Sequence, residues 1–216
     1  GVMSALLTGE EGEITLGKPE FLHILYRLGM RMMTLTWNHE NSLGYPNKQE
    51  KGLKEQGIFF LQEMEHLGMI IDVSHLSDTG FYDVLAHTKK PFVASHSNAR
   101  SLCASPRNLT DDMIRKLAER GGIAGINFYQ HFLGKQNADE SYLDLAVQHM
   151  KYMINLGGED FVALGSDFDG IHRYDDIPDC SVLPKLVQTM KTAGLTPTQI
   201  EKICYQNTLR IYRELL

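Results

Sequence analysis

The sequence predicts an α/β fold of the β/α (TIM-like) barrel type, in which parallel strands alternate with helices. Apolar runs at residues 69–73 and 91–94 each end in a polar stretch that contains a histidine, His75 and then His96. Between them, residues 78–88 place apolar side chains at helical spacing. A strand, a helix and a second strand in this order form the repeating unit of a parallel sheet.

The rest of the chain continues this alternation. Further strands are expected at residues 2–8, 30–37, 123–129 and 161–165. Further helices are expected at residues 19–28, 54–67, 110–120 and 141–156, with a mostly helical remainder to Leu216. These make about six β/α units without a linker, whereas eight units close a barrel of roughly 250 residues. We therefore expect a single domain over residues 1–216, the C-terminal portion of a barrel whose first two strands are missing from this chain.

An open, doubly wound sheet of six strands is the alternative fold. Such sheets normally bring a glycine-rich phosphate-binding turn, and none of the expected strand ends offers G-x-G-x-x-G or a P-loop.

Composition and charge exclude several classes of protein. Of the 216 residues 43% are hydrophobic, which is typical of a globular domain. A formal net charge of −6 without a Lys/Arg run argues against a nucleic-acid partner. Three widely spaced cysteines indicate neither a disulfide framework nor a thiolate zinc site, so we expect a reducing compartment, the cytoplasm. No apolar run has the length of a membrane span, and we expect no membrane association.

The expected strand ends place metal-binding and acid/base groups together. In a barrel, the C-terminal ends of all strands meet on one face. The groups at these ends are Glu10, the Trp37-Asn38-His39 stretch, His75, His96, Asn127 and Asp167. One histidine alone is more often structural, and Glu10 by itself would be a solvated loop acid. Two imidazoles with one or two carboxylates suit zinc or a similar ion, and a second metal would suit hydrolysis of an amide or ester.

The segment GSDFDG, residues 165–170, has a competing interpretation as a calcium loop. Twelve-residue calcium loops end in glutamate, but the twelfth position from Asp167 is Pro178. A catalytic loop is the better interpretation. The remaining histidines, among them His149, are expected to be surface or packing residues, and Cys103 a small buried apolar one.

Several segments together resemble the membrane (renal) dipeptidase family of zinc metallopeptidases. They are LGMRMMTLTWN, DVSH, SHSNARSLCASPRNLTDD, GINFY, GSDFDG and the closing NTLRIYREL, in the family's order and over nearly the whole chain. The resemblance implies a barrel of the metal-dependent hydrolase type with two zinc ions in the complete domain. It also implies hydrolysis of dipeptides by a metal-activated water, with some members accepting a D-residue at the C-terminal position.

The resemblance also implies roles for individual residues. Glu10 matches the carboxylate that bridges both metals, with Glu11 as the alternative because the EEGE cluster can shift by one residue. His75 and His96 match two ligands of the second metal.

On the substrate side, the resemblance makes Arg107 the clamp on the dipeptide carboxylate and Asp167 the acid/base that handles the proton of the attacking water. The family often has a histidine where this chain has Trp37. The hydrogen bond to the scissile carbonyl oxygen would then come from Asn38 or His39.

A further departure concerns the first metal. The family's H-x-D pair is absent, since none of the nine histidines is followed two residues later by aspartate. This agrees with a chain that is the C-terminal part of a catalytic domain. Two alternatives stay open: another barrel metallohydrolase acting on cyclic amides or phosphoesters, and a non-catalytic binding protein with an incomplete metal site. The sequence does not decide which dipeptides are cleaved or whether a homodimer forms.

Overall fold

A computed structural model describes residues 5–138, 140–172 and 176–216 of the chain. The chain divides into two compact units, Gly1–Val93 with Tyr212–Leu216, and Ala94–Ile211. Six strands follow one another in chain order, and every pair with a recorded register is parallel. The strands are β1 (Leu7–Gly9), β2 (Met30–Thr34), β3 (Ile70–Asp72), β4 (Val93–Ala94), β5 (Ile123–Asn127) and β6 (Val162–Ser166).

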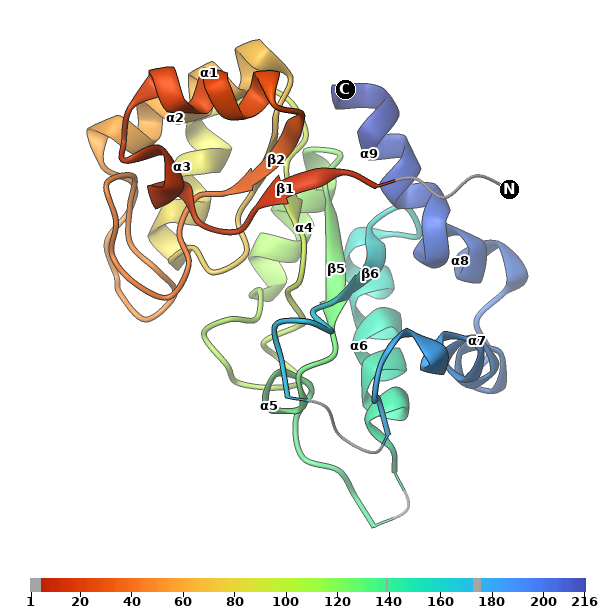
Figure 1. Ribbon diagram of the computed structural model, residues 1–216. Helices are drawn as coiled ribbons and strands as arrows, with labels where there is room; N and C mark the ends of the chain where they lie inside the picture. Colours follow the sequence, from red (N-terminus) through yellow and green to blue (C-terminus); the bar gives the residue numbers. More distant parts are fainter. Residues whose placement is uncertain (1–4, 139, 173–175) are drawn as a thin grey trace. The chain divides into compact units, whose positions relative to one another are not determined.

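The first unit alternates strands with three helices, which Figure 1 shows beside β1 and β2. They are α1 (Pro19–Arg27), α2 (Glu55–Leu67) and α3 (Asp78–His87). The end of α2 shows how the sequence determines these boundaries. Gly68 adopts a left-handed φ of 77°, which favours glycine, and the Met69 N–H then bonds back to the Met64 carbonyl. The chain is thereby turned directly into β3.

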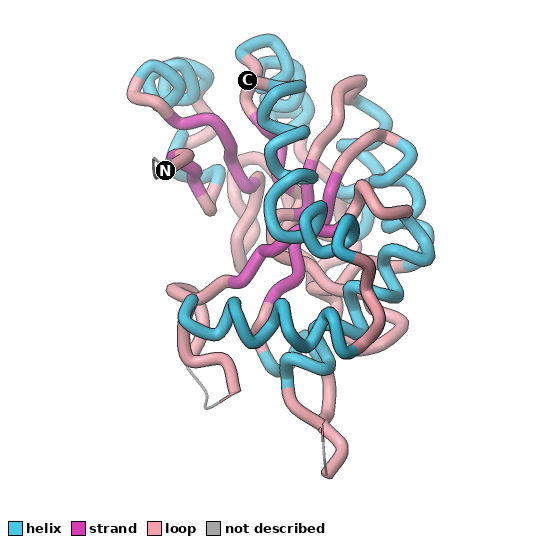
Figure 2. The backbone as a smooth tube through the Cα atoms, turned by 90° about the vertical axis from the view of Figure 1, so that its right-hand side faces the viewer, coloured by secondary structure: helices cyan, strands magenta, loops and turns pink. Residues whose placement is uncertain are grey.

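The second unit holds β5, β6 and most of the remaining helices. These are α4 (Asp111–Glu119), α5 (Gln130–Leu133), α6 (Tyr142–Gly157), α7 (Leu183–Thr192), α8 (Pro197–Glu201), a π-helical turn (Lys202–Gln206) and α9 (Asn207–Leu215), whose last residues belong to the first unit. Figure 2 distinguishes its helices from its strands by colour. A β-carbon added at Gly125 or Gly165 would collide with the Ser95 carbonyl oxygen and with the backbone of the other glycine. Only glycine permits this close approach of three neighbouring segments.

The predicted elements are confirmed, and most strands are shorter than the apolar runs that predicted them, while β6 keeps its length and is shifted by one residue. The strand expected at residues 30–37 ends at Thr34, because the amide of Asn41 takes the Leu35 carbonyl oxygen that a longer strand would use. Of the strand expected at residues 2–8, residues 2–4 lie outside the described part of the chain. The short helix α5 and a 3₁₀ turn at Gly12–Thr15 were not predicted. Among the described helices none is both long and apolar enough to cross a membrane.

Candidate metal and catalytic site

His75 lies just beyond the end of β3 and faces an oxygen with each of its ring nitrogens. Its Nε2 lies 3.1 Å from Oε1 of Glu10, and its Nδ1 lies 3.1 Å from Oδ1 of Asn38. The imidazole is buried, whereas the Glu10 side chain is 49% exposed. The imidazole that follows β3 is therefore in direct contact with the carboxylate that follows β1.

This arrangement has a chemical consequence. A neutral imidazole offers one N–H donor and one acceptor nitrogen, but both nitrogens of His75 face acceptor oxygens. With the Asn38 amide placed this way, a bound cation between Nε2 and the Glu10 carboxylate would let Nδ1–H donate to Asn38. Metal-bound histidines are usually oriented by such a hydrogen bond from the other nitrogen. Imidazole nitrogen and carboxylate oxygen are also zinc ligands, so this donor set fits the ion that the sequence predicted.

The neighbouring Glu11 is engaged elsewhere. Its Oε1 accepts a hydrogen bond from the Glu13 N–H (3.0 Å) and another from the Asn41 amide (2.6 Å). Its Oε2 accepts from the Trp37 N–H at 3.3 Å. Glu11 therefore caps the turn after β1 and fixes the loop after β2, while Glu10 faces His75.

The Trp37 ring of the β2 loop lies beside this histidine, and the His39 ring lies beside Trp37. The Trp37 ring lies 6.3 Å from the His75 ring and 6.2 Å from the His39 ring, measured between centroids. Trp37 is 43% exposed, and His39 is exposed as well. Of the two predicted oxyanion donors, Asn38 contacts His75 through its oxygen, which leaves its NH₂ group as the side that can donate.

In the second unit, His96 and Arg107 lie close together. Nδ1 of the buried His96 lies 2.7 Å from the Ser95 hydroxyl oxygen. The Arg107 guanidinium donates long hydrogen bonds, both 3.4 Å, to the Ser97 hydroxyl and to the His96 carbonyl. It also lies 5.5 Å from the centroid of the Phe132 ring. The predicted carboxylate clamp is therefore a buried cation beside a predicted metal ligand.

Asp167 follows β6 in a tight turn. The Gly170 N–H donates to the Asp167 carbonyl at 3.0 Å, and the exposed Asp169 lies between them. Oδ2 of Asp167 accepts a hydrogen bond from Nδ2 of Asn127 at 2.9 Å. The sequence placed Asn127 at a strand end but gave it no role.

Backbone strain gathers at these residues. Four described non-glycine residues have a positive φ, namely Leu16 (51°), His75 (70°), Ser166 (20°) and Asp167 (70°). Left-handed backbone is unfavourable for residues with a β-carbon, and such strain clusters at functional sites. Two of the four are the predicted ligand and the predicted acid/base.

His149 is a packing residue, one of the two roles that the sequence predicted for it. It is fully buried on α6, where Nδ1 accepts a hydrogen bond from the Ala99 N–H and Nε2 lies 3.1 Å from the Leu133 carbonyl oxygen. Burial lowers the pKa of His149 to about 4. The neutral ring thus fastens the start of the Arg107 loop to the end of α5.

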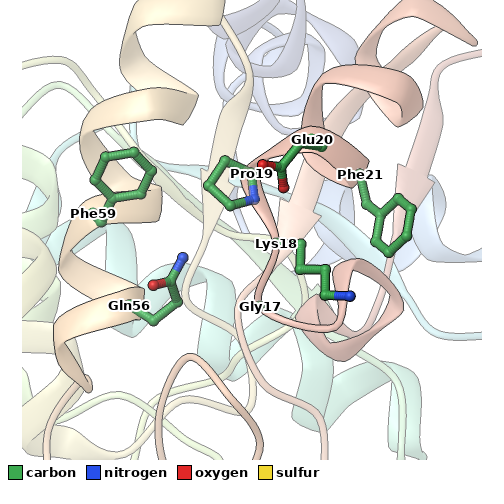
Figure 3. Close-up of a pocket in the computed structure, with 7 residues that line it drawn as sticks. All are labelled: Gly17, Lys18, Pro19, Glu20, Phe21, Gln56 and Phe59. Atoms are coloured by element: carbon green, nitrogen blue, oxygen red, sulfur yellow. The ribbon is translucent and has the colours of Figure 1, made fainter.

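A separate hollow of about 750 Å³ lies on the first unit, and none of the site residues described above lines it (Figure 3). Figure 3 shows its lining side chains coming from the start of α1, the turn before it, and α2. The phenyl rings of Phe21 and Phe59 border it, and Lys18 and Glu20 are its only ionisable groups. It therefore lacks the ligands and acid/base groups of the predicted chemistry.

Comparisons with known proteins match this chain to one family. The family model described as membrane dipeptidase (peptidase family M19) matches residues 2–215. An uncharacterized protein in the pqqA 5′ region of Klebsiella pneumoniae is 38% identical over 210 residues, covering 92% of this chain and 77% of that protein. The uncharacterized dipeptidase C965.12 of Schizosaccharomyces pombe is 36% identical over 200 residues, covering 88% of this chain and 47% of that protein.

Solved structures agree with this match. A metallopeptidase from Rhodobacter sphaeroides, liganded with a phosphinate mimic of the dipeptide L-Ala-D-Ala, superposes with a TM-score of 0.92 at 30% identity. The alignment covers 98% of this chain and 63% of that one. An amidohydrolase from Pseudomonas aeruginosa shares the fold, with a TM-score of 0.89 at 23% identity. That alignment covers 97% of this chain and 72% of the amidohydrolase. The predicted α/β fold class of barrel hydrolases is confirmed, and this chain belongs to the membrane dipeptidase family, peptidase family M19.

Proposed function

We propose that this protein hydrolyses dipeptides with the help of bound zinc, and that the chain supplies ligands, a substrate clamp and an acid/base. The observation that supports this most directly is the contact of His75 with Glu10, with Asn38 on the other side of the ring. That is the arrangement of an oriented histidine ligand and a carboxylate ligand, in a chain of a peptidase family.

The proposed ligands are Glu10, His75 and His96, with two ions in the complete domain. Glu10 is preferred to Glu11 because Glu11 already accepts three hydrogen bonds in its loop. When bound, the ions would supply Lewis acidity and lower the pKa of a coordinated water.

Arg107 would bind the C-terminal carboxylate of the dipeptide. A planar guanidinium can donate two parallel hydrogen bonds to a carboxylate, and burial strengthens such a pair. Two hydrogen bonds of Arg107, to the Ser97 hydroxyl and the His96 carbonyl, are 3.4 Å long and go to neutral oxygens, whereas a carboxylate would accept shorter and stronger bonds. This interaction would favour substrates whose free carboxylate lies one residue beyond the scissile bond, as it does in a dipeptide.

Asp167 would move the proton. As a carboxylate it takes a proton from the attacking water and then delivers it to the departing amine, which leaves poorly unless it is protonated. The NH₂ group of Asn38, or His39, would donate a hydrogen bond to the scissile carbonyl oxygen, and the exposed Trp37 offers an apolar surface beside them.

The substrate class rests on the family and on one relative. The structure liganded with a mimic of L-Ala-D-Ala suggests that dipeptides with a C-terminal D-residue are included. The three free cysteines, Cys103, Cys180 and Cys204, suit a reducing compartment such as the cytoplasm.

A substrate panel tests the proposal. The purified full-length protein, loaded with zinc, is assayed against L,L- and L,D-dipeptides, dipeptide amides, lactones and phosphoesters. Cleavage of free dipeptides that stops with a chelator and returns with zinc is the expected result. Turnover of only lactones or phosphoesters would instead indicate another metallohydrolase, and zinc binding without turnover a binding protein.

A further inference from the structure

Three buried asparagines of the second unit form a chain of hydrogen bonds that reaches Asp167. They are Asn98, Asn108 and Asn127, each exposed by 1% or less. Each lies within one of the sequence segments that resemble the peptidase family, and none has a role in the proposed function. A buried amide needs partners for its oxygen and its NH₂ group, so the partners reveal what it holds in place.

The orientation of the Asn127 amide is fixed by the groups around it. Its Oδ1 accepts a hydrogen bond from the Tyr129 N–H at 2.7 Å, a group that can only donate. Its Nδ2 therefore faces the acceptors, Oδ2 of Asp167 at 2.9 Å and the His96 carbonyl oxygen at 3.4 Å. Asn127 thus presents a donor to the Asp167 carboxylate, and that donor cannot accept or release a proton in the working pH range.

Asn98 holds the backbone of Asn127 from the neighbouring segment. Its Oδ1 accepts from the Asn127 N–H at 2.9 Å, and its Nδ2 donates to the Asn127 carbonyl oxygen at 3.0 Å. The side-chain amide of Asn98 thus bonds both backbone groups of Asn127, as the backbone of a neighbouring strand would, at the point where β5 ends. The register between β5 and β6 also shifts at Ile126/Asn127, a bulge of the kind that re-aims side chains.

Asn108 links this pair to the loop of the predicted clamp. Its Oδ1 accepts from the Asn98 N–H at 3.3 Å, and its Nδ2 donates to the Cys103 and Phe132 carbonyl oxygens, each at 2.9 Å. Arg107 directly precedes it in the chain. The same network therefore fixes the segment that carries the carboxylate clamp and the strand end that faces the acid/base.

We propose that Asn127 is a positioning residue for Asp167: its amide N–H holds one carboxylate oxygen and so sets the direction in which Asp167 exchanges its proton. This inference rests on the proposed function, in which Asp167 is the acid/base. Asp167 needs such a partner because it stands in a left-handed turn after Ser166, where its own backbone is strained. Misplacement of a catalytic group by about 1 Å can cost on the order of 100-fold in rate.

The test is Asn127→Asp in the zinc-loaded full-length protein. The substitution keeps the shape of the side chain and an acceptor for the Tyr129 N–H, but replaces the donor to Asp167 with an oxygen. We expect kcat for a dipeptide to fall by roughly 10–100-fold, with KM changed less than about threefold. Asn127→Ala, which removes the amide donor without adding charge, should lower kcat in the same direction, so the result does not depend on one variant folding.

The matched control is Asn207→Asp. Asn207 is also buried in the second unit, and its Nδ2 donates to the Glu159 and Val162 carbonyl oxygens, at 3.0 and 2.8 Å. This variant should lower the melting temperature without lowering the kcat of the folded enzyme. A comparable fall in kcat for Asn207→Asp would show that Asn127 acts only through general stability, and would overturn the proposal.

A double variant separates positioning from an independent effect. If Asn127 acts through Asp167, adding Asn127→Asp to Asp167→Asn should lower kcat by less than about twofold more. If the losses in kcat from the two substitutions multiply in the double variant, Asn127 does not act through Asp167. The same conclusion follows if the single Asn127 variants keep a kcat within twofold of the wild type. Either result would overturn the role of Asn127 while leaving the proposed function intact. A wild type that cleaves no dipeptide, or a fully active Asp167→Asn enzyme, would overturn the proposed function and this inference with it.

Discussion

Nε2 of His75 lies 3.1 Å from Oε1 of Glu10, although 65 positions separate the two residues in the chain. The contact joins a loop after β1 to a loop after β3, where His75 adopts a positive φ of 70°. Since Asn38 faces the other ring nitrogen, the imidazole is oriented in the way that metal-bound histidines usually are.

The first prediction concerns the metal. If the proposed function is correct, the wild-type full-length protein should hold about two zinc ions per chain, as two-metal hydrolases do. Glu10→Gln removes the anionic ligand but keeps its size, and should weaken zinc binding by more than about tenfold. Zinc content measured by elemental analysis after dialysis against a weak chelator checks this.

Glu11→Gln is the matched control, because it makes the same change one residue away. Glu11 contacts the loops rather than His75, so this variant should keep its zinc. Zinc lost from Glu11→Gln and retained by Glu10→Gln would show that the bridging ligand is Glu11.

The second prediction concerns the carboxylate clamp. Arg107→Lys keeps the charge but loses the paired donors of the guanidinium. We expect kcat/KM for free dipeptides to fall by a free-energy equivalent of roughly 1.5–3 kcal/mol, the scale of a hydrogen bond to a charged group. Dipeptide amides, which lack the carboxylate, should be poor substrates for both proteins.

The control for this substitution is Arg100→Lys on the same loop. The Arg100 guanidinium donates to the Asn108 and Pro106 carbonyl oxygens, so its loss disturbs the loop without removing the proposed clamp. We expect only a small change in kcat/KM. Equal losses for Arg100→Lys and Arg107→Lys would argue for an effect on loop structure alone.

The helices were the most predictable part of the fold. Their boundaries follow from local chemistry, such as Pro19 at the start of α1 and the hydroxyl of Thr110 that caps α4. Strand ends were less predictable, because a strand ends where its hydrogen bonds to the neighbouring strand end, and that neighbour lies far away in the sequence. β2 ends at Thr34, opposite Asp72 at the end of β3, although the apolar pattern continues beyond it.

The candidate site was predictable as a set of residues but not as a set of contacts. His75 and Asp167 follow from their places at strand ends. The EEGE cluster gives no local reason to prefer Glu10 to Glu11, since the choice depends on Trp37 and Asn41, far along the chain. The contact of Asn127 with Asp167 could not be predicted either, because an asparagine at a strand end acquires a partner only when the next strand is placed.

The third prediction concerns the acid/base. Asp167→Asn keeps the size of the side chain but can no longer take up a proton at Oδ. We expect kcat to fall by roughly 10²–10⁴-fold, the usual contribution of general acid–base catalysis, with zinc content unchanged. Asp169→Asn is the control, because Asp169 is an exposed residue of the same turn and its substitution should lower kcat far less. Steady-state kinetics with parallel metal analysis measures both, and a fully active Asp167→Asn enzyme would remove Asp167 from the mechanism.

The last prediction is a pH dependence of stability that comes from His149. Burial lowers the pKa of His149 to about 4 in the folded protein, against 6.5 for the ordinary side chain. Between these values the unfolded chain binds a proton that the folded chain does not, so the free energy of unfolding falls as pH falls from 6.5 toward 4. The slope from this single group is about 1.4 kcal/mol per pH unit.

His149→Gln removes the titrating group while keeping a donor and an acceptor for the Leu133 carbonyl and the Ala99 N–H. The wild type should therefore be more stable than this variant above pH 6.5, and its advantage should shrink steadily as the pH is lowered toward 4. Urea unfolding of both proteins at pH 7.5, 6.5, 5.5 and 4.5 measures this difference, in which contributions from all other groups cancel. A difference that stays constant across the series would mean that His149 takes up its proton in the folded protein as readily as in the unfolded chain, and that burial does not keep its ring neutral.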